Sequence, residues 1–244
     1  MNKLLQLALL GICGLSTSYV NAAITLDRTR VVFPGSNNVL SLKISNPNKE
    51  LPYLAQAWIE DESGKKINSP FTVLPPIQRL EPEDSSMLQV RSLPAVSQLP
   101  QDKESLFYFN VREVPPKSEK SNVLQLALQT KVKFFYRPQA LVVQADSTKA
   151  PWQEQLTLHP EGDGYRLDNP TPYYVTVVEV SLASKAPALT SFESVMLAPK
   201  SSSKLNLGGK TLGNSPVFTY IDDYGGRRQL NYQCSTTCRL IAGK

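Results

Sequence analysis

The chain of 244 residues carries 26 lysines and arginines against 21 aspartates and glutamates, a single histidine and a formal net charge of +5. The basic residues are interspersed with acidic ones, so the clustered positive charge of a nucleic-acid-binding protein is missing and no nucleic-acid partner is expected. With one histidine, the chain also lacks the usual pair of groups for serine or cysteine nucleophilic catalysis near neutral pH, which argues against a hydrolase.

The N-terminal segment has the three parts of a secretory signal peptide. Lys3 supplies a positive start, Leu4–Leu15 is mostly apolar, and Val20–Ala22 offers small residues for cleavage. The apolar run of about twelve residues is shorter than the roughly 20 that a spanning helix needs. Residues 1–22 are therefore predicted to be removed, which leaves an exported chain that starts near Ala23.

The next part of the chain contains short runs of alternating or β-branched residues. Turn-forming groups such as "PGSNN", "NPNKE" and "EPEDS" separate these runs. This rhythm is typical of an antiparallel β-sandwich, and no segment has the pattern of a long amphipathic helix. The predicted strands cover residues 23–33, 38–45, 53–60, 85–93, 105–114 and 124–138.

A second series of predicted strands follows a polar stretch after Pro138. A polar stretch between two complete series favours a domain boundary, which we place near residue 144. Two β-sandwich domains in tandem, residues 23–143 and 144–244, are the simplest interpretation. The second series covers residues 156–160, 165–170, 173–182, 193–199, 202–207, 216–222 and 227–234.

Two cysteines follow the predicted signal peptide, Cys234 and Cys238 in "YQCSTTCRL". An even number in an exported protein favours a disulfide, which we expect to pin a terminal hairpin. Its loop is so short that it should contribute less than the roughly 3 kcal/mol of a 15-residue loop. His159 is interpreted as a turn residue. Because these three side chains lack a fourth usual ligand, no metal site is expected.

Several blocks of the chain together resemble one protein family. The run "LPQDKESLFYFNVREVPP" is closely similar to the signature of the PapD-like periplasmic pilus chaperones. Further blocks match in family order: "ITLDRTRVVF", "LPYLAQAWIED", "VLQLALQTKVKFFYRP", "NPTPYYVTV", "VMLAPKS" and "YIDDYGGR". The resemblance covers essentially the whole mature chain. It implies two immunoglobulin-like β-sandwich domains in a boomerang arrangement, and a periplasmic chaperone with neither enzymatic activity nor a cofactor.

The resemblance also implies partners and a binding mode. Such chaperones bind pilus subunits whose own sandwich lacks a strand, lend them a strand, and deliver them to an outer-membrane usher, which is a known form of strand addition. Leu124, Leu126 and Leu128 match the alternating apolar residues of the lent strand. Arg30 and Lys133 match a basic pair that binds the C-terminal carboxylate of the subunit.

A third set of residues matches a structural feature of the family. Glu104, Arg137 and Asp223 correspond to the salt-bridge network between the two domains, in which one guanidinium serves two carboxylates.

The short connection "PPKSEKSN" before the lent strand resembles that of the branch of the family that serves rod-type adhesive pili.

The residues by themselves leave other interpretations open. Without the family, the three leucines read as the inward face of an ordinary sandwich strand, and Lys131 and Lys133 as charges that protect a strand edge. With strict alternation Lys133 lies on the face opposite the leucines. Either the strand therefore twists or bulges near Gln129–Lys131, or the carboxylate approaches from the other face.

Two rival functions and one association state also stay open. The chain fits a secreted two-domain adhesin or carbohydrate-binding protein, and less well a hydrolase on a sandwich scaffold. An exposed apolar strand edge also favours self-association. A dimer that hides residues 124–128 in the absence of a subunit is therefore a further expectation.

Overall fold

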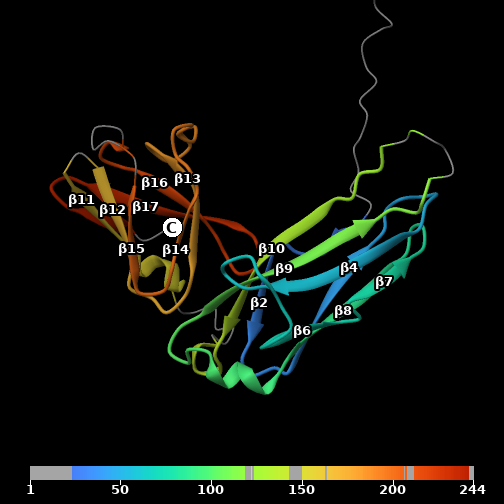
Figure 1. Cartoon of the computed structure of the whole chain (residues 1–244). Helices are drawn as coiled ribbons and strands as arrows, with labels where there is room; N and C mark the ends of the chain where they lie inside the picture. The colour runs from blue at the N-terminus through green and yellow to red at the C-terminus, as the bar shows by residue number, and fades with distance from the viewer. Residues whose placement is uncertain are drawn as a thin grey trace, which may run out of the picture.

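A computed structural model describes residues 24–118, 122, 124–142, 150–162, 164–205, 207 and 212–241. The predicted signal peptide and the predicted boundary near residue 144 lie outside these residues. In the described parts the chain forms two β-sandwiches that meet at an angle (Figure 1). The predicted all-β architecture of two sandwiches is confirmed.

The first sandwich packs a four-stranded sheet against a six-stranded one. The order in the four-stranded sheet is β1 (Thr25–Leu26), β3 (Val39–Ser45), β8 (Ser85–Ser92) and β6 (Phe71–Leu74). The six-stranded sheet, called the β10 sheet below, has the order β2 (Arg30–Pro34), β10 (Gln129–Arg137), β9 (Ser105–Val114), β4 (Tyr53–Glu60) and β5 (Lys66–Ile67), with β7 (Ile77–Leu80) also paired to β4. The 3-10 helix η1 (Pro94–Gln98) precedes β9, and η2 (Gln139–Leu141) follows β10.

Aromatic side chains fill the space between these two sheets. Phe71 and Phe134 are fully buried, and their ring centroids lie 5.0 Å apart. Because alternate residues of a strand point to one face, Val132, Phe134 and Tyr136 of β10 all enter this core. Burial of each large apolar side chain is worth about 1.5–3 kcal/mol, so the core determines which face of β10 points inward.

The second sandwich has a separate core and two smaller sheets. The three-stranded sheet has the order β11 (Thr157–Glu161), β12 (Gly164–Asn169) and β15 (Ser201–Leu205). The five-stranded sheet has the order β14 (Val195–Leu197), β13 (Val175–Ser181), β16 (Val217–Ile221), β17 (Arg227–Cys234) and β18 (Cys238–Ile241). The 3-10 helix η3 (Trp152–Gln155) precedes β11. Leu167, Val177, Phe218 and Tyr232 are among the core residues.

Three predicted features of the first sandwich differ from the structure. The strand predicted over 23–33 is two strands in different sheets, β1 and β2, because the chain crosses between the sheets at 27–29. Strands β6 and β7 do not stand out in the sequence, since each has four residues and the prolines between them read as a longer turn. The strand predicted over 124–138 begins only at Gln129.

The end of the second sandwich differs in two details. Strand β18 was not predicted, and His159 lies within β11 rather than in a turn, 3.1 Å from the Thr157 hydroxyl. Cys234 and Cys238 are register partners in β17 and β18 and form a disulfide. The bond therefore closes the hairpin at the end of the described chain.

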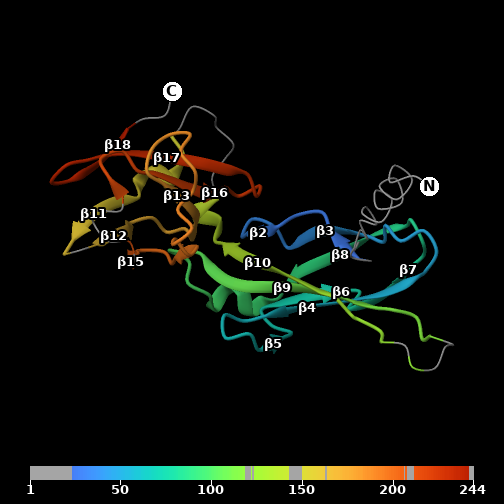
Figure 2. The same cartoon turned by 90° about the horizontal axis from the view of Figure 1, so that it is seen from above.

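The turn between β16 and β17 is the part of the second sandwich that reaches the first. Both views place it beside β2 and β10 (Figures 1 and 2). Within the described residues, no helix is long and apolar enough to cross a membrane.

Candidate functional site

The face of the β10 sheet that points away from the first core meets the second sandwich, and we call it the outer face. Alternation places Lys131, Lys133, Phe135 and Arg137 of β10 on this face. Arg30, at the start of β2, joins them because β2 pairs with β10 in parallel and Arg30 is the register partner of Lys133. The two predicted carboxylate-binding residues therefore lie side by side.

Both basic side chains contact the second sandwich through neutral oxygen atoms. Arg30 is 8% exposed, and its Nη1 donates a hydrogen bond to the carbonyl oxygen of Ile221 at 3.1 Å. Lys133 Nζ donates to the hydroxyl of Thr176 at 3.1 Å. In the described part of the chain, neither basic side chain forms an ion pair with a carboxylate.

The surroundings make both charges unfavourable in the free protein. Burial lowers the pKa of Arg30, and this effect exceeds the opposing effect of the nearby Asp223 carboxylate. Burial, followed by the charge of Arg30, also lowers the pKa of Lys133. Two cations held together away from water form a site for an anion, because an incoming carboxylate accepts charge-assisted hydrogen bonds from both.

Strand β10 has no bulge that turns Lys133 toward the leucines. Its pairing with β9 runs from Gln129 opposite Arg112 to Tyr136 opposite Ser105 without a shift of register. Lys133 therefore stays on the outer face, and the bulge considered from the sequence is absent from the described strand.

The three leucines lie just before β10 and are exposed. Leu124 is 83%, Leu126 66% and Leu128 43% exposed. A backbone hydrogen bond from Glu113 N to Leu128 O continues the β9 pairing up to this point. Leu124, Leu126 and Leu128 are each an even number of residues from Val132, so strand pairing extended from Leu128 toward Leu124 would place them on the inward face of β10, beyond the end of the first core.

Lys131 is bound within the outer face and is not a free edge charge. Its Nζ lies 2.6 Å from Glu60 Oε2 and 4.4 Å from the centroid of the Tyr108 ring. Glu60 also accepts a hydrogen bond from Trp58 Nε1 at 2.8 Å. Burial raises the pKa of Glu60, but the hydrogen bonds from Lys131 and Trp58 outweigh burial and lower it, so the carboxylate is charged near neutral pH.

Arg137 connects the two sandwiches. Its Nε donates to Glu104 Oε1 at 2.8 Å, and Nη1 and Nη2 donate to the two carboxylate oxygens of Asp223 at 2.6 and 3.0 Å. Burial alone would lower the pKa of Arg137, but Asp223 and Glu104 outweigh burial and raise it. Arg137 and Glu104 are 6% and 3% exposed. The three residues matched to the interdomain network thus lie in contact.

The second sandwich contributes contacts at this joint that were not predicted residue by residue. The Tyr173 ring lies 4.8 Å from the Arg137 guanidinium, and the Tyr174 backbone N–H donates to Glu104 Oε2 at 2.7 Å. Both tyrosines, and Thr176 beside Lys133, belong to the block "NPTPYYVTV". The block matches the family, but which of its groups face the first sandwich depends on how the domains meet.

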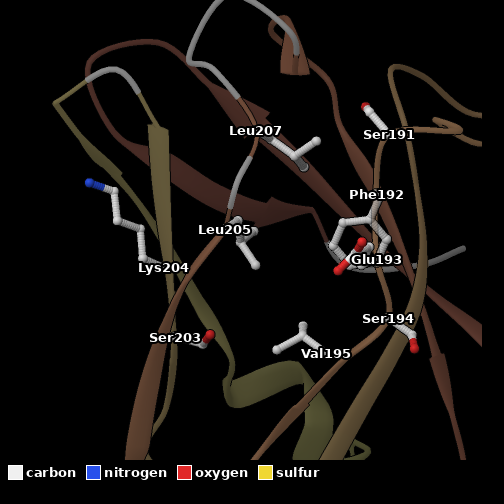
Figure 3. Close-up of a pocket in the computed structure, with 9 residues that line it drawn as sticks. All are labelled: Ser191, Phe192, Glu193, Ser194, Val195, Ser203, Lys204, Leu205 and Leu207. Carbon is white, nitrogen blue, oxygen red and sulfur yellow. The ribbon is translucent and has the colours of Figure 1, made fainter.

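Several hollows lie in the described structure. One of about 400 Å³ adjoins Arg30 and is lined by residues of both sandwiches, including Arg30, Val32, Asp223 and Tyr224. Another, of about 350 Å³, opens between β14 and β15 (Figure 3) and shares no residue with the outer face. Among the described residues, no group of three potential metal ligands is found.

Comparisons with known proteins identify the family. Residues 23–142 match the model for "Pili and flagellar-assembly chaperone, PapD N-terminal domain", and residues 151–232 match "Pili assembly chaperone PapD, C-terminal domain". The chain is 51% identical to the chaperone protein PapD of Escherichia coli over 219 residues, which cover 89% of each chain.

Solved structures show the same architecture. The periplasmic chaperone SfaE matches with a TM-score of 0.68 at 30% identity, over 85% of this chain and 98% of that one. The SafB chaperone, solved in complex with the Salmonella enterica SafA pilin, matches with a TM-score of 0.69 at 26% identity, over 86% of this chain and 96% of that one. The chain belongs to the PapD-like family of periplasmic pilus-assembly chaperones.

Proposed function

We propose that this chaperone captures pilus subunits by lending them the segment Leu124–Leu128 together with the start of β10. The observation that carries the proposal is the exposed leucine stripe, which continues the core face of β10 where the first sandwich has no core left to cover it. A subunit that lacks a strand offers the missing groove. The adhesin and hydrolase alternatives leave this stripe without a role.

The apolar contribution of the lent segment is substantial. Leu124, Leu126 and Leu128 are 83%, 66% and 43% exposed, so nearly all of the first and most of the second side chain is available for burial. At about 1.5–3 kcal/mol for a fully exposed leucine, these exposed fractions together give roughly 3–6 kcal/mol before the cost of association. Backbone hydrogen bonds along the added strand supply further affinity.

The basic pair would determine where the subunit chain ends. Arg30 and Lys133 bind the C-terminal carboxylate, and the rest of the subunit strand extends along β10 toward Leu124. Since the chain end then lies at the C-terminal side of the lent segment, the subunit strand runs parallel to β10. Each charge-assisted hydrogen bond is worth about 1.5–3 kcal/mol.

The remaining parts of the molecule have structural roles in this proposal. The ion-pair network of Glu104, Arg137 and Asp223 holds the angle between the domain of residues 23–143 and that of 144–244. The protein acts without enzymatic chemistry or a cofactor, and it delivers the subunit to an outer-membrane usher. Release follows when the next subunit replaces the lent strand.

Co-expression with a pilus subunit, followed by purification from the periplasm, tests this function. We expect a 1:1 complex, and Leu126→Glu should impair capture far more than the matched control Gln125→Glu, because only Leu126 lies on the stripe. If the subunit is equally soluble without this chain, the chaperone function is wrong. If both variants capture equally well, the lent apolar face is wrong.

A further inference from the structure

Two lysines of β10 offer alternative positions for a terminal carboxylate. Lys131 and Lys133 are separated by one residue and lie on the same outer face. Two residues of strand span about 6.8 Å, and a shift of two residues preserves the alternation of faces. A subunit strand anchored at Lys131 would thus still present its apolar groove to the leucines, but one leucine position out of place.

The structure treats these two lysines differently. Lys131 Nζ lies 2.6 Å from a carboxylate oxygen of Glu60, and it also lies over the Tyr108 ring. Within the described residues, the hydrogen bond of Lys133 Nζ goes to a neutral oxygen, the Thr176 hydroxyl, and Lys133 has Arg30 as its register partner. The positive charge of Lys131 is therefore neutralised, whereas that of Lys133 is reinforced.

We propose that Glu60 determines the register of the captured subunit by occupying Lys131, so that only Lys133 with Arg30 binds the terminal carboxylate. This inference rests on the proposed function and names a specificity-determining residue within it. Glu60 itself does not touch the subunit; it acts through Lys131.

Glu60 is built into the sheet in a way that suits this role. It is 9% exposed, and the indole Nε1 of Trp58 donates to its second oxygen at 2.8 Å. The cations of Lys66 and Arg112 in turn lie over the Trp58 ring, 5.5 and 5.8 Å from its centroid. With one oxygen bound by Trp58 and the other by Lys131, Glu60 is held toward Lys131.

Arg30 favours the same register from the other side. Strand β2 begins at Arg30, so no residue of β2 lies beside Lys131. At Lys133 the carboxylate is bound by two cationic side chains, Lys133 and Arg30. At Lys131 it would have to displace Glu60 and would be bound by one cationic side chain. Specificity here combines attraction at the correct position with competition at the wrong one, as in other interfaces that discriminate between close alternatives.

Single cysteines in the lent segment can report the register. A subunit residue that lies opposite Ala127 in the Lys133 register lies opposite Gln125 in the Lys131 register. A co-expressed subunit with one cysteine at that residue is therefore combined with Ala127→Cys or with Gln125→Cys. Cys234 and Cys238 are joined to each other, so the introduced cysteine is free to react. Capture by each reporter is first checked by co-purification.

With native Glu60 we expect the cross-link at Ala127→Cys to dominate. Glu60→Gln keeps the size of the side chain and an acceptor for Trp58 but removes the charge. The yield of the Gln125→Cys cross-link relative to that of the Ala127→Cys cross-link should then rise about tenfold or more, as expected when a charged competitor is lost. The double variant Glu60→Gln with Lys131→Gln should restore the original ratio.

Two controls and two contrary outcomes complete the test. The matched control Glu62→Gln removes an exposed charge on the same part of the chain and should leave the ratio unchanged. If Glu60→Gln captures the subunit with an unchanged ratio, Glu60 does not set the register, although the chaperone function stands. If no co-purification occurs with native Glu60, the proposed function itself fails. Equal thermal unfolding of the native protein and Glu60→Gln confirms that the fold is intact.

Discussion

Replacement of Arg137 by methionine tests whether the buried ion pairs hold the two sandwiches together. The arginine is 6% exposed and serves Glu104 at 2.8 Å and Asp223 at 2.6 and 3.0 Å. Methionine retains an apolar stem beside Tyr173 but removes the charge. Glu104, which is 3% exposed, then lies in the interior without its cation.

The expected loss of stability is large because the acid left behind is buried. Removal of one partner of a buried ion pair costs about 3–5 kcal/mol. The Asp223 side chain is 30% exposed and can regain water, so we assign most of the cost to Glu104. Asp223→Asn should therefore cost only about 1 kcal/mol. Glu104→Gln combined with Arg137→Met should cost less than Arg137→Met alone.

Urea unfolding followed by tryptophan fluorescence measures this difference. The Trp152 ring lies 4.4 Å from Tyr173, which in turn lies under Arg137, so its emission reports on the joint. Because a two-domain protein need not unfold in one step, the midpoints of the two sandwiches are fitted separately. A loss below about 1 kcal/mol for Arg137→Met, or equal losses for Arg137→Met and Asp223→Asn, would refute the assignment of the cost to buried Glu104.

Three further predictions concern the basic pair and the disulfide. Lys133→Met should abolish subunit capture in co-purification. Its Tm should stay the same or rise slightly, because burial lowers the pKa of Lys133 and its charge therefore opposes folding. A large drop in Tm would mean that Lys133 is structural. Since the pKa of Lys133 lies below its usual 10.5, its unfavourable contribution to stability begins to decrease as pH rises through the lowered pKa and is gone above the usual value. Subunit affinity should begin to fall at the lowered pKa, because Lys133 of the free chaperone then loses its charge. Titration calorimetry at increasing pH checks this fall, which should be smaller in Lys133→Arg. Cys234→Ser with Cys238→Ser should cost less than about 3 kcal/mol in urea unfolding, because the closed loop is short, and a greater loss would contradict that limit.

Much of the architecture could be predicted because its signals are local. Alternating apolar residues separated by turn residues indicate strands, and two such series indicate two sandwiches. The predictions fail where the local signal is weak. Strands β6 and β7 are short and separated only by prolines, and the run over 23–33 does not show that its two halves join different sheets.

For the site too, the residues could be named from the sequence, whereas their contacts could not. The family blocks name Arg30, Lys133 and the leucines, but not the partners of these residues. The contact of Lys133 with Thr176 joins positions 43 residues apart, and that of Arg30 with Ile221 joins positions 191 apart. Such contacts depend on how two separately folded sandwiches meet.

By itself, the sequence determined the all-β class and the alternation of β10, because each depends on residues that are neighbours along the chain; the signal peptide stays a prediction of the same local kind. Only the tertiary structure decided that Lys133 stays on the outer face, and that Lys131 is already bound by Glu60. The first follows from an uninterrupted register with β9. The second follows because β9 brings β4 within reach of β10, although Glu60 and Lys131 are 71 residues apart.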